Sequence, residues 1–263
     1  MPELPEVNTF QQIFNEAALH QKIQRVDVYD AKIIKNVSGE EFSSLLCKQT
    51  FKSSYRQGKY LFGILASGHS VMMHFGMTGD FKYYNDPDER AKHERFVFVF
   101  ENGFHLGFDC PRKFAKILYL EDYKAYLKKI NLGEDALRIK VETFLNQMNG
   151  KTGTIKAFLL KQSNLAGVGN LYADEICFRT KIHPASKIPK LKIAKRKAIF
   201  HAMKKILQYG VDRNATYGNY PDDWLWHFRN EGEKGPKGKG IIGRATIAGR
   251  TSYFVEGVQK LWL

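Results

Sequence analysis

The first six residues, Met1-Pro2-Glu3-Leu4-Pro5-Glu6, place an amine and two carboxylates where covalent chemistry is possible. Because the side chain of Pro2 is small, we expect Met1 to be removed, which leaves Pro2 as a terminal secondary amine. A terminal α-amine titrates near ~8, so part of it is unprotonated and nucleophilic at neutral pH. Its condensation with an aldehyde gives an iminium ion, an electron sink of the kind that Schiff bases provide. From the hexapeptide alone, two prolines that only stiffen the start of the chain remain an alternative.

The elements that would position this amine are a helix and a set of short strands. Apolar residues recur with helical spacing over residues 7–20, so the amine is expected just before a helix N-terminus. Short β-branched or aromatic segments separated by turn residues then predict strands, with the spacing of an antiparallel sandwich or barrel. The predicted strands cover residues 23–29, 60–65, 71–75, 81–84, 96–100, 104–108 and 116–120.

The pattern becomes helical after Glu121, and the chain ends in a hairpin pattern. Helices are predicted over residues 123–129, 141–149, 153–161, 171–178 and 190–208, and hairpin strands over 244–247 and 251–255. We therefore expect an α+β chain of two domains, an antiparallel β-sandwich with flanking helices and a helical domain that ends in the hairpin. The predicted boundaries are 1–130, 131–230 and 231–263.

The charge of the chain is uneven. Its 263 residues contain 41 Lys and Arg against 27 Asp and Glu, a net charge of +14. Residues 1–130 hold 18 basic and 16 acidic residues, so 23 and 11 remain for residues 131–263, a net charge of +12. This asymmetry favours a polyanionic partner held mainly by the second half, although a generally basic surface is an alternative. We interpret the basic helix at residues 190–205 mainly as a solvated face that adds long-range attraction.

The three cysteines, Cys47, Cys110 and Cys177, are scattered, and favour neither a disulfide framework nor a zinc site. The first twenty residues carry no Lys or Arg and do not resemble a signal peptide. No apolar run reaches the ~20 residues of a membrane span. We therefore expect an intracellular protein, cytoplasmic or nucleoid-associated, without a membrane partner.

Five further motifs follow the terminal hexapeptide in a fixed order. They are Arg56-Gln57-Gly58-Lys59-Tyr60-Leu61, His74-Phe75-Gly76-Met77-Thr78-Gly79, Pro111-Arg112-Lys113-Phe114, Leu165-Ala166-Gly167-Val168-Gly169-Asn170-Leu171-Tyr172-Ala173 and Ile182-His183-Pro184. In this order and spacing they strongly resemble the formamidopyrimidine-DNA glycosylase/endonuclease VIII family, across nearly the whole chain. Members of that family flip an oxidised base out of duplex DNA, displace it with the terminal proline and nick the abasic strand by elimination.

The resemblance implies roles for the catalytic residues. Pro2 would attack the sugar C1′, and Glu3 would protonate the ring oxygen or shuttle protons. Glu6 would help to fix the amine, although an acid that complements the helix dipole is an alternative. Lys59 would contact a phosphate and donate a proton in β-elimination, where an ordinary surface lysine is the alternative.

Further residues would bind DNA by the same resemblance. His74 and Met77 lie in a turn between strands, and Met77, Arg112 and Phe114 match the trio that fills the gap left by a flipped base. Arg112 offers donors suited to the orphaned opposite base. The alternative places Met77 and Phe114 in the core. Cys110 looks like an extra residue that would shift the register of the loop.

The second half carries the remaining predicted contacts. The segment 167–170 resembles the turn before the second helix of a helix–two-turn–helix motif, where Asn170 would cap the helix and the backbone would face a phosphate. Lys156 matches a second phosphate contact. Arg250 matches a phosphate clamp that assists δ-elimination, with an ordinary hairpin-turn arginine as the alternative.

The terminal hairpin departs from the family pattern, which usually has four zinc-binding cysteines there. Val255 and Val258 stand where the last two would be, and glycines near Gly235 and Gly238 where the first two would be. Without thiolates or imidazoles at these places no tetrahedral zinc site forms. The hairpin resembles a zincless finger, and we expect packing by residues such as Ile247, Tyr253 and Val255. No metal or cofactor is predicted.

Together these features predict a bifunctional glycosylase and abasic-site lyase that acts on formamidopyrimidines and 8-oxoguanine in damaged double-stranded DNA, as a monomer. The interval between Gly210 and Trp224 is shorter than the family's loop over 8-oxoguanine. Oxidised pyrimidines or hydantoins are therefore the alternative substrates. A non-catalytic DNA-binding protein on the same scaffold is the alternative of another class.

Overall fold

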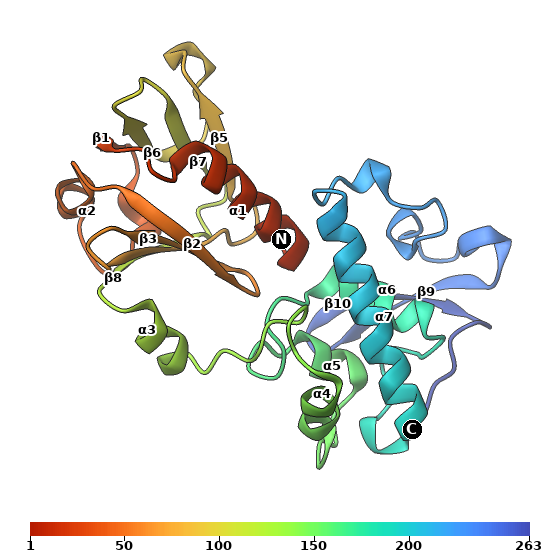
Figure 1. The fold of residues 1–263 in the computed structure, drawn as a ribbon. Coiled ribbons are helices and arrows are strands. Elements are labelled where there is room, and N and C mark those ends of the chain that lie inside the picture. Colours follow the sequence, from red (N-terminus) through yellow and green to blue (C-terminus); the bar gives the residue numbers. More distant parts are fainter. The chain divides into compact units, whose positions relative to one another are not determined.

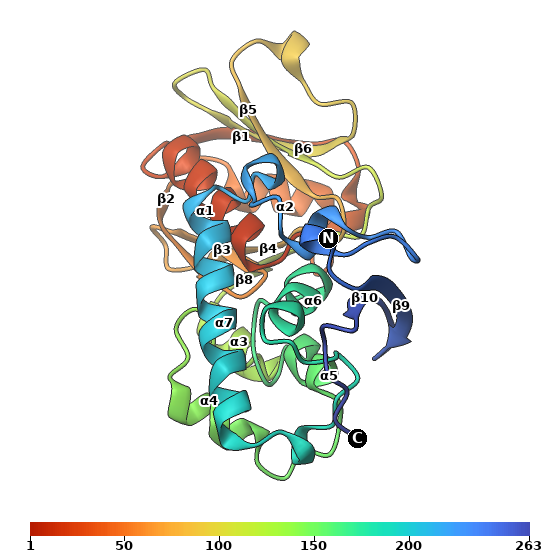
Figure 2. The ribbon, with the colours of Figure 1, turned by 90° about the vertical axis from the view of Figure 1, so that its right-hand side faces the viewer.

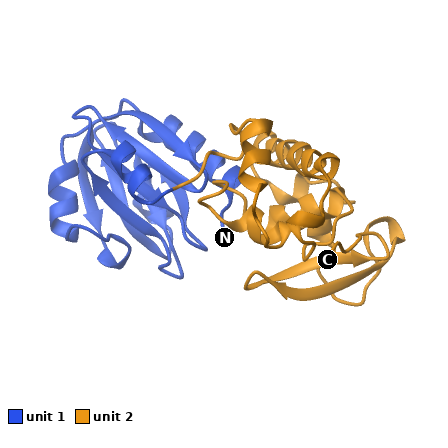
Figure 3. Cartoon of the chain, turned by 90° about the horizontal axis from the view of Figure 1, so that it is seen from below, with its two compact units in different colours: residues 1–131 blue, residues 132–263 orange.

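Two units make up the fold in the computed structural model, which describes residues 1–263. The first covers Met1–Asn131 and the second Leu132–Leu263 (Figure 3). Helices of the first unit are α1 (Leu4–Ala18), α2 (Gly39–Leu46) and α3 (Tyr123–Lys129). Its strands are β1 (Ile23–Val28), β2 (Phe51–Gln57), β3 (Tyr60–Leu65), β4 (Ser70–His74), β5 (Asp80–Tyr84), β6 (Glu94–Phe100), β7 (His105–Asp109) and β8 (Lys116–Leu120).

The strands form two four-stranded antiparallel sheets, in the orders β1-β6-β7-β5 and β2-β3-β4-β8 (Figure 1). Aromatic side chains dominate the core of this unit, because the strands are rich in phenylalanine. The Phe108 ring stacks on those of Phe96 and Phe75, with centroids 5.2 and 5.3 Å apart. Burial of these aromatic side chains between the strands therefore drives the sandwich, and the predicted α+β class is confirmed.

Helix α1 covers part of this core and begins earlier than predicted, at Leu4. Glu3 occupies the N-cap position, and Pro5 lies in the first turn, where its missing N–H costs nothing. Phe14 of α1 meets Phe51 of β2 edge to face, with ring centroids 4.9 Å apart. The start of the chain is thus fixed by a helix that packs on the sandwich.

The helices of the second unit are α4 (Val141–Met148), α5 (Ile155–Leu160), α6 (Asn170–Arg179) and α7 (Ile193–Asp212), and its strands are β9 (Ile241–Ile247) and β10 (Arg250–Glu256). Helix α6 lies between the long α7 and the hairpin, and it packs against both (Figure 2). None of the helices combines the length and apolar character needed to cross a lipid bilayer.

The hairpin pairs β9 with β10 through a tight turn at Ala248 and Gly249, which both have positive φ. Val255 packs with Ile242 and Leu225, and Tyr253 and Val258 pack against this cluster. Ile247 is buried but lies outside the cluster. The packing predicted for the hairpin therefore holds for Tyr253 and Val255 within this cluster.

Candidate functional site

The start of α1 places the carboxylates of Glu3 and Glu6 close to Pro2 along the chain. The Glu3 amide donates to Glu6 Oε2 over 2.7 Å, as in a capping box. Glu3 is only 3% exposed, whereas Pro2 and Glu6 are half-buried. Glu6 therefore lies in the first turn of the helix, as its alternative interpretation states, and the same bond holds its carboxylate beside the segment that carries Pro2.

Lys59 follows the turn between β2 and β3, where Gly58 takes a φ of 57°. The Arg56 Nη1 closes this turn by donating to the Gly58 carbonyl over 3.1 Å. Lys59 itself is only 6% exposed. An ordinary surface lysine is solvated, so this alternative for Lys59 does not fit the structure.

His74 ends β4 opposite Tyr60, and their ring centroids are 4.9 Å apart. Its Nδ1 accepts a hydrogen bond from the Gly76 amide over 3.2 Å. Burial, with the positive charges of Lys59 and Lys116, lowers the pKa of His74 to about 4. The imidazole is therefore neutral near pH 7, and the occupied Nδ1 assigns its proton to Nε2. His74 is thus suited to donate one hydrogen bond rather than to act as a cation.

The loop that carries Met77 touches the loop that carries Arg112 and Phe114. A Cβ on Gly76 would lie 2.4 Å from the Phe114 carbonyl carbon, and the Arg112 amide donates to Thr78 Oγ1 over 3.3 Å. The Arg112 guanidinium carbon lies 5.1 Å from the Phe114 ring centroid. Met77 is 40% and Phe114 53% exposed, so the alternative that places them in the core is wrong.

Cys110 lies in the core beneath these loops, where it is completely buried. Its carbonyl accepts hydrogen bonds from Arg95 Nε, over 2.9 Å, and from the Lys113 amide. Lys113 takes a positive φ of 56° in this loop. The residue that looked additional in the sequence therefore anchors the loop that carries Arg112 and Phe114.

In the second unit the side chain of Gln162 organises the glycine-rich turn. Its Oε1 accepts from the Gly167 amide over 3.0 Å, and its Nε2 donates to the Val168 carbonyl over 2.8 Å. The sequence did not predict a role for Gln162, because a polar residue just before a turn is common and carries no specific signal. Gly167 has a φ of 114°, which a residue with a side chain rarely adopts.

Asn170 does not cap α6, so this prediction is wrong. Gly169 holds the N-cap position, and Asn170 is the first helical residue. The Asn170 Nδ2 instead donates to the Thr251 carbonyl in β10 over 2.8 Å. The side chain therefore joins the helix to the terminal hairpin, next to Arg250, which is exposed beside the hairpin turn.

Lys156 is completely buried, which does not favour its predicted contact with a phosphate. Its Nζ lies 2.5 Å from Asp174 Oδ1 and 2.6 Å from Ser252 Oγ. A buried amine held between two acceptors is engaged within the protein. The phosphate contact of Lys156 stays a prediction, and the internal contacts of its amine do not favour it.

The basic face of α7 is partly engaged as well. Arg196 donates to the Leu191 carbonyl over 2.9 Å, and the Lys195 amine lies 5.1 Å from the Trp262 ring centroid. Lys197 is exposed.

No group of three or more His, Cys, Asp or Glu side chains is arranged to hold a metal ion.

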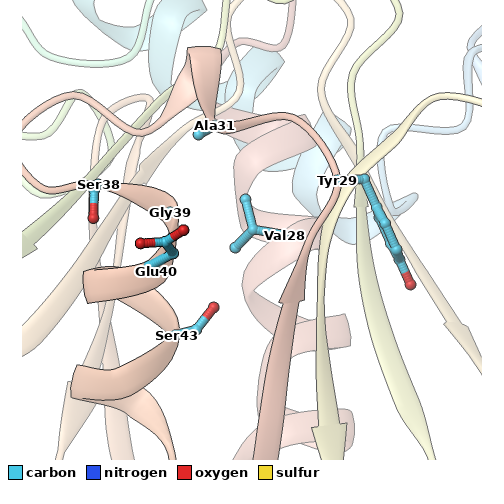
Figure 4. Close-up of a pocket in the computed structure, with 7 residues that line it drawn as sticks. All are labelled: Val28, Tyr29, Ala31, Ser38, Gly39, Glu40 and Ser43. Carbon is cyan, nitrogen blue, oxygen red and sulfur yellow. The ribbon is translucent and has the colours of Figure 1, made fainter.

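A hollow of about 430 Å³ opens between the end of β1 and the start of α2 (Figure 4). Val28 and Tyr29 line one side of it, and Ser38, Glu40 and Ser43 the other. It shares no residue with the predicted site.

Comparison with known families matches both units. The model of the formamidopyrimidine-DNA glycosylase N-terminal domain matches residues 1–117, and that of its H2TH domain matches residues 132–222. Curated formamidopyrimidine-DNA glycosylases of Arabidopsis thaliana and Pelotomaculum thermopropionicum are each 31% identical to the chain. Their alignments cover 100% and 99% of this chain, and 72% and 100% of the relatives.

The chain belongs to the formamidopyrimidine-DNA glycosylase family. Membership makes it a DNA glycosylase of base excision repair, and it confirms the predicted family. The fold agrees with that of the Lactococcus lactis formamidopyrimidine-DNA glycosylase bound to DNA with an abasic site, with a TM-score of 0.87. That structure is 24% identical, and the match covers 98% of this chain and 99% of the other. A second Lactococcus lactis structure, with DNA that contains Fapy-dG, has the same TM-score at 23% identity.

Proposed function

We propose that this glycosylase removes formamidopyrimidines and 8-oxoguanine from duplex DNA through a Schiff base on Pro2, and then cleaves the strand by β,δ-elimination. The observation that carries the proposal is the start of α1, where Pro2 precedes a buried Glu3 whose amide is bound by Glu6. A carboxyl group in this position is close in sequence to the reacting amine and shielded from water, as an acid–base catalyst requires.

The proposed reaction begins when the Pro2 nitrogen attacks C1′ and the glycosidic bond breaks. The bonding electron pair and a proton leave with the base, while Glu3 protonates the ring oxygen as the sugar opens to the iminium ion. Loss of a C2′ proton sends electrons into this ion and expels the 3′ phosphate, and loss of the C4′ proton in a second elimination expels the 5′ phosphate. Water then hydrolyses the iminium ion, which releases the unsaturated aldehyde and restores the Pro2 amine. The iminium ion is the electron sink for both steps.

Flipping the base requires replacement contacts in the duplex. Unstacking costs a few kcal/mol, which apolar side chains inserted into the gap partly offset. The exposed Met77 and Phe114, with Arg112 beside them, have the chemistry for this role. We further propose phosphate contacts by Lys59 and Arg250, with His74 and Asn170 contributing hydrogen bonds to the same DNA.

The segment after α7 supports a preference among lesions. It is short, and aromatic side chains pack within it, with the Tyr217 and Trp226 rings stacked 4.4 Å apart. A short segment whose side chains pack on one another has little reach to close over 8-oxoguanine. We therefore propose that ring-opened lesions are excised faster than 8-oxoguanine, with oxidised pyrimidines and hydantoins as the alternative substrates. A lesion panel under single-turnover conditions ranks them.

The test of the nucleophile is borohydride trapping on duplex DNA with 8-oxoguanine or an abasic site. Reduction of the iminium ion should leave a covalent protein–DNA adduct, and Pro2→Gly should lower its rate at least tenfold. Absence of any adduct from protein that has lost Met1 would favour the non-catalytic DNA-binding alternative. Mass spectrometry that finds Met1 retained in fully active protein would refute Pro2 as the nucleophile.

A further inference from the structure

Three consecutive residues after Arg250 are tied to helices of the same unit. The Thr251 carbonyl accepts from Asn170 Nδ2, and Ser252 Oγ lies 2.6 Å from Lys156 Nζ. The Tyr253 amide donates to Asp174 Oδ2 over 3.2 Å. The start of β10 is therefore fixed by polar contacts to α5 and α6.

The centre of this arrangement is an ion pair between Lys156 and Asp174, which are both completely buried. Asp174 also accepts from Arg229 Nη2 over 3.4 Å, and the Arg229 guanidinium carbon lies 4.4 Å from the Tyr253 ring centroid. Burial lowers the pKa of Lys156 and raises that of Asp174, and their contact opposes both effects. Apolar replacements of a buried ion pair are often neutral or stabilising, so we interpret this pair as fixing the geometry of its contacts rather than as adding stability.

The hairpin needs polar contacts that fix its position near the turn, because its apolar cluster lies at the other end. Val255 pairs with Ile242 at the end remote from the turn, and their cluster with Leu225 holds that end. Arg250 pairs with Ile247 beside the turn. An isolated two-stranded ribbon is only marginally stable in water, so the turn end requires its own anchor.

We propose that Lys156 and Asp174, acting through Ser252 and the Tyr253 amide, are positioning residues that hold Arg250 in register for its DNA phosphate. This inference rests on the proposed function of Arg250 as a phosphate clamp in δ-elimination. In this arrangement Lys156 does not touch DNA. Its charge instead fixes the strand from which Arg250 projects.

The test compares Lys156→Met, Ser252→Ala and Arg250→Ala on duplex DNA with a preformed abasic site. Each should lower the ratio of δ- to β-elimination product at least threefold. In Lys156→Met and Ser252→Ala the rate of borohydride trapping should change less than twofold. Lys156→Met combined with Arg250→Ala should lower the ratio no further than Arg250→Ala alone. Lys204→Met is the control, because Lys204 Nζ donates to the Leu137 carbonyl, away from the hairpin.

The outcomes distinguish a failure of the positioning role from a failure of the proposed role of Arg250. If Arg250→Ala lowers the ratio and both Lys156→Met and Ser252→Ala leave it unchanged, the positioning role is wrong and the role of Arg250 stands. If Arg250→Ala has no effect, both are wrong. Additive effects of Lys156→Met and Arg250→Ala, with a binding salt slope reduced by ~0.9 in Lys156→Met, would instead reveal a direct phosphate contact. Should Lys156→Met fail to fold, Ser252→Ala, which keeps the ion pair, decides the question.

Discussion

At the scale of single residues, two lysines that look alike in the sequence differ in their surroundings in the structure. Lys59 and Lys156 are both almost or completely buried, yet Lys156 meets a carboxylate within its own unit while Lys59 follows a tight turn beside His74. The pattern around each residue predicts a solvated charge. The family motif alone predicts a functional role for Lys59, and the structure alone shows that Lys156 pairs with Asp174.

The neutral state of His74 predicts a pH dependence of stability. Its pKa is about 4 in the folded protein, against ~6.5 when exposed, so the unfolded chain binds more protons between these values. The free energy of unfolding should therefore fall as the pH is lowered from about 6.5 to about 4, by about 3 kcal/mol at most. His74→Gln should remove this part of the slope in urea unfolding.

The exposed His201, on α7, provides the matched control. His201→Gln should leave the wild-type pH dependence in place. Equal slopes for wild type and His74→Gln would contradict the neutral, desolvated state of His74.

At the scale of elements, the contact between the two loops of the first unit depends on Gly76. It has a φ of 64°, and an added Cβ would clash with the Phe114 backbone. Gly76→Ala should lose about 1–2 kcal/mol of stability from the backbone and a further ~1–3 kcal/mol from the clash. It should also slow base excision more than cleavage of a preformed abasic site, because Met77 and Phe114 separate.

Gly103 offers a control with the same backbone demand and no clash. Its φ is 85°, and nothing lies within 4 Å of an added Cβ. Gly103→Ala should therefore show only the backbone loss in thermal unfolding and normal excision. Equal losses for the two variants would mean that the loops adjust freely.

Much of the element order follows from the sequence, because most strands carry short runs of buried apolar residues. Strand β2 escaped prediction since only Phe51 and Arg56 along it are buried, which leaves a polar pattern. Helix α2 escaped because Phe42 and Leu46 are its only buried residues. Motifs supplied the candidate site, but no local pattern links Lys156 with Asp174 or Asn170 with Thr251. Those pairs depend on tertiary packing between separate elements.

At the scale of the whole molecule, the second half carries most of the excess positive charge. Binding of a duplex should weaken steeply with salt, since each phosphate contact contributes about 0.9 to the slope of log K against log salt. Arg250→Ala should reduce this slope by about 0.9, measured by fluorescence anisotropy between 50 and 300 mM salt. Lys197→Met, on the exposed face of α7, should reduce the slope by clearly less than Arg250→Ala, because this lysine adds only screened long-range attraction. Binding of the wild type that does not change with salt would refute the proposed phosphate contacts.

The manner in which β9 and β10 are held has a consequence for conditions of oxidative stress. Peroxide and related oxidants attack accessible thiolates, and a finger built on cysteine ligands can lose its metal when they do so. Here the apolar cluster of Leu225, Ile242 and Val255 and a buried Lys–Asp pair take that place, and residues 231–263 contain no cysteine. The protein can thus keep its terminal ribbon intact in the same chemical surroundings that create the lesions it is proposed to remove.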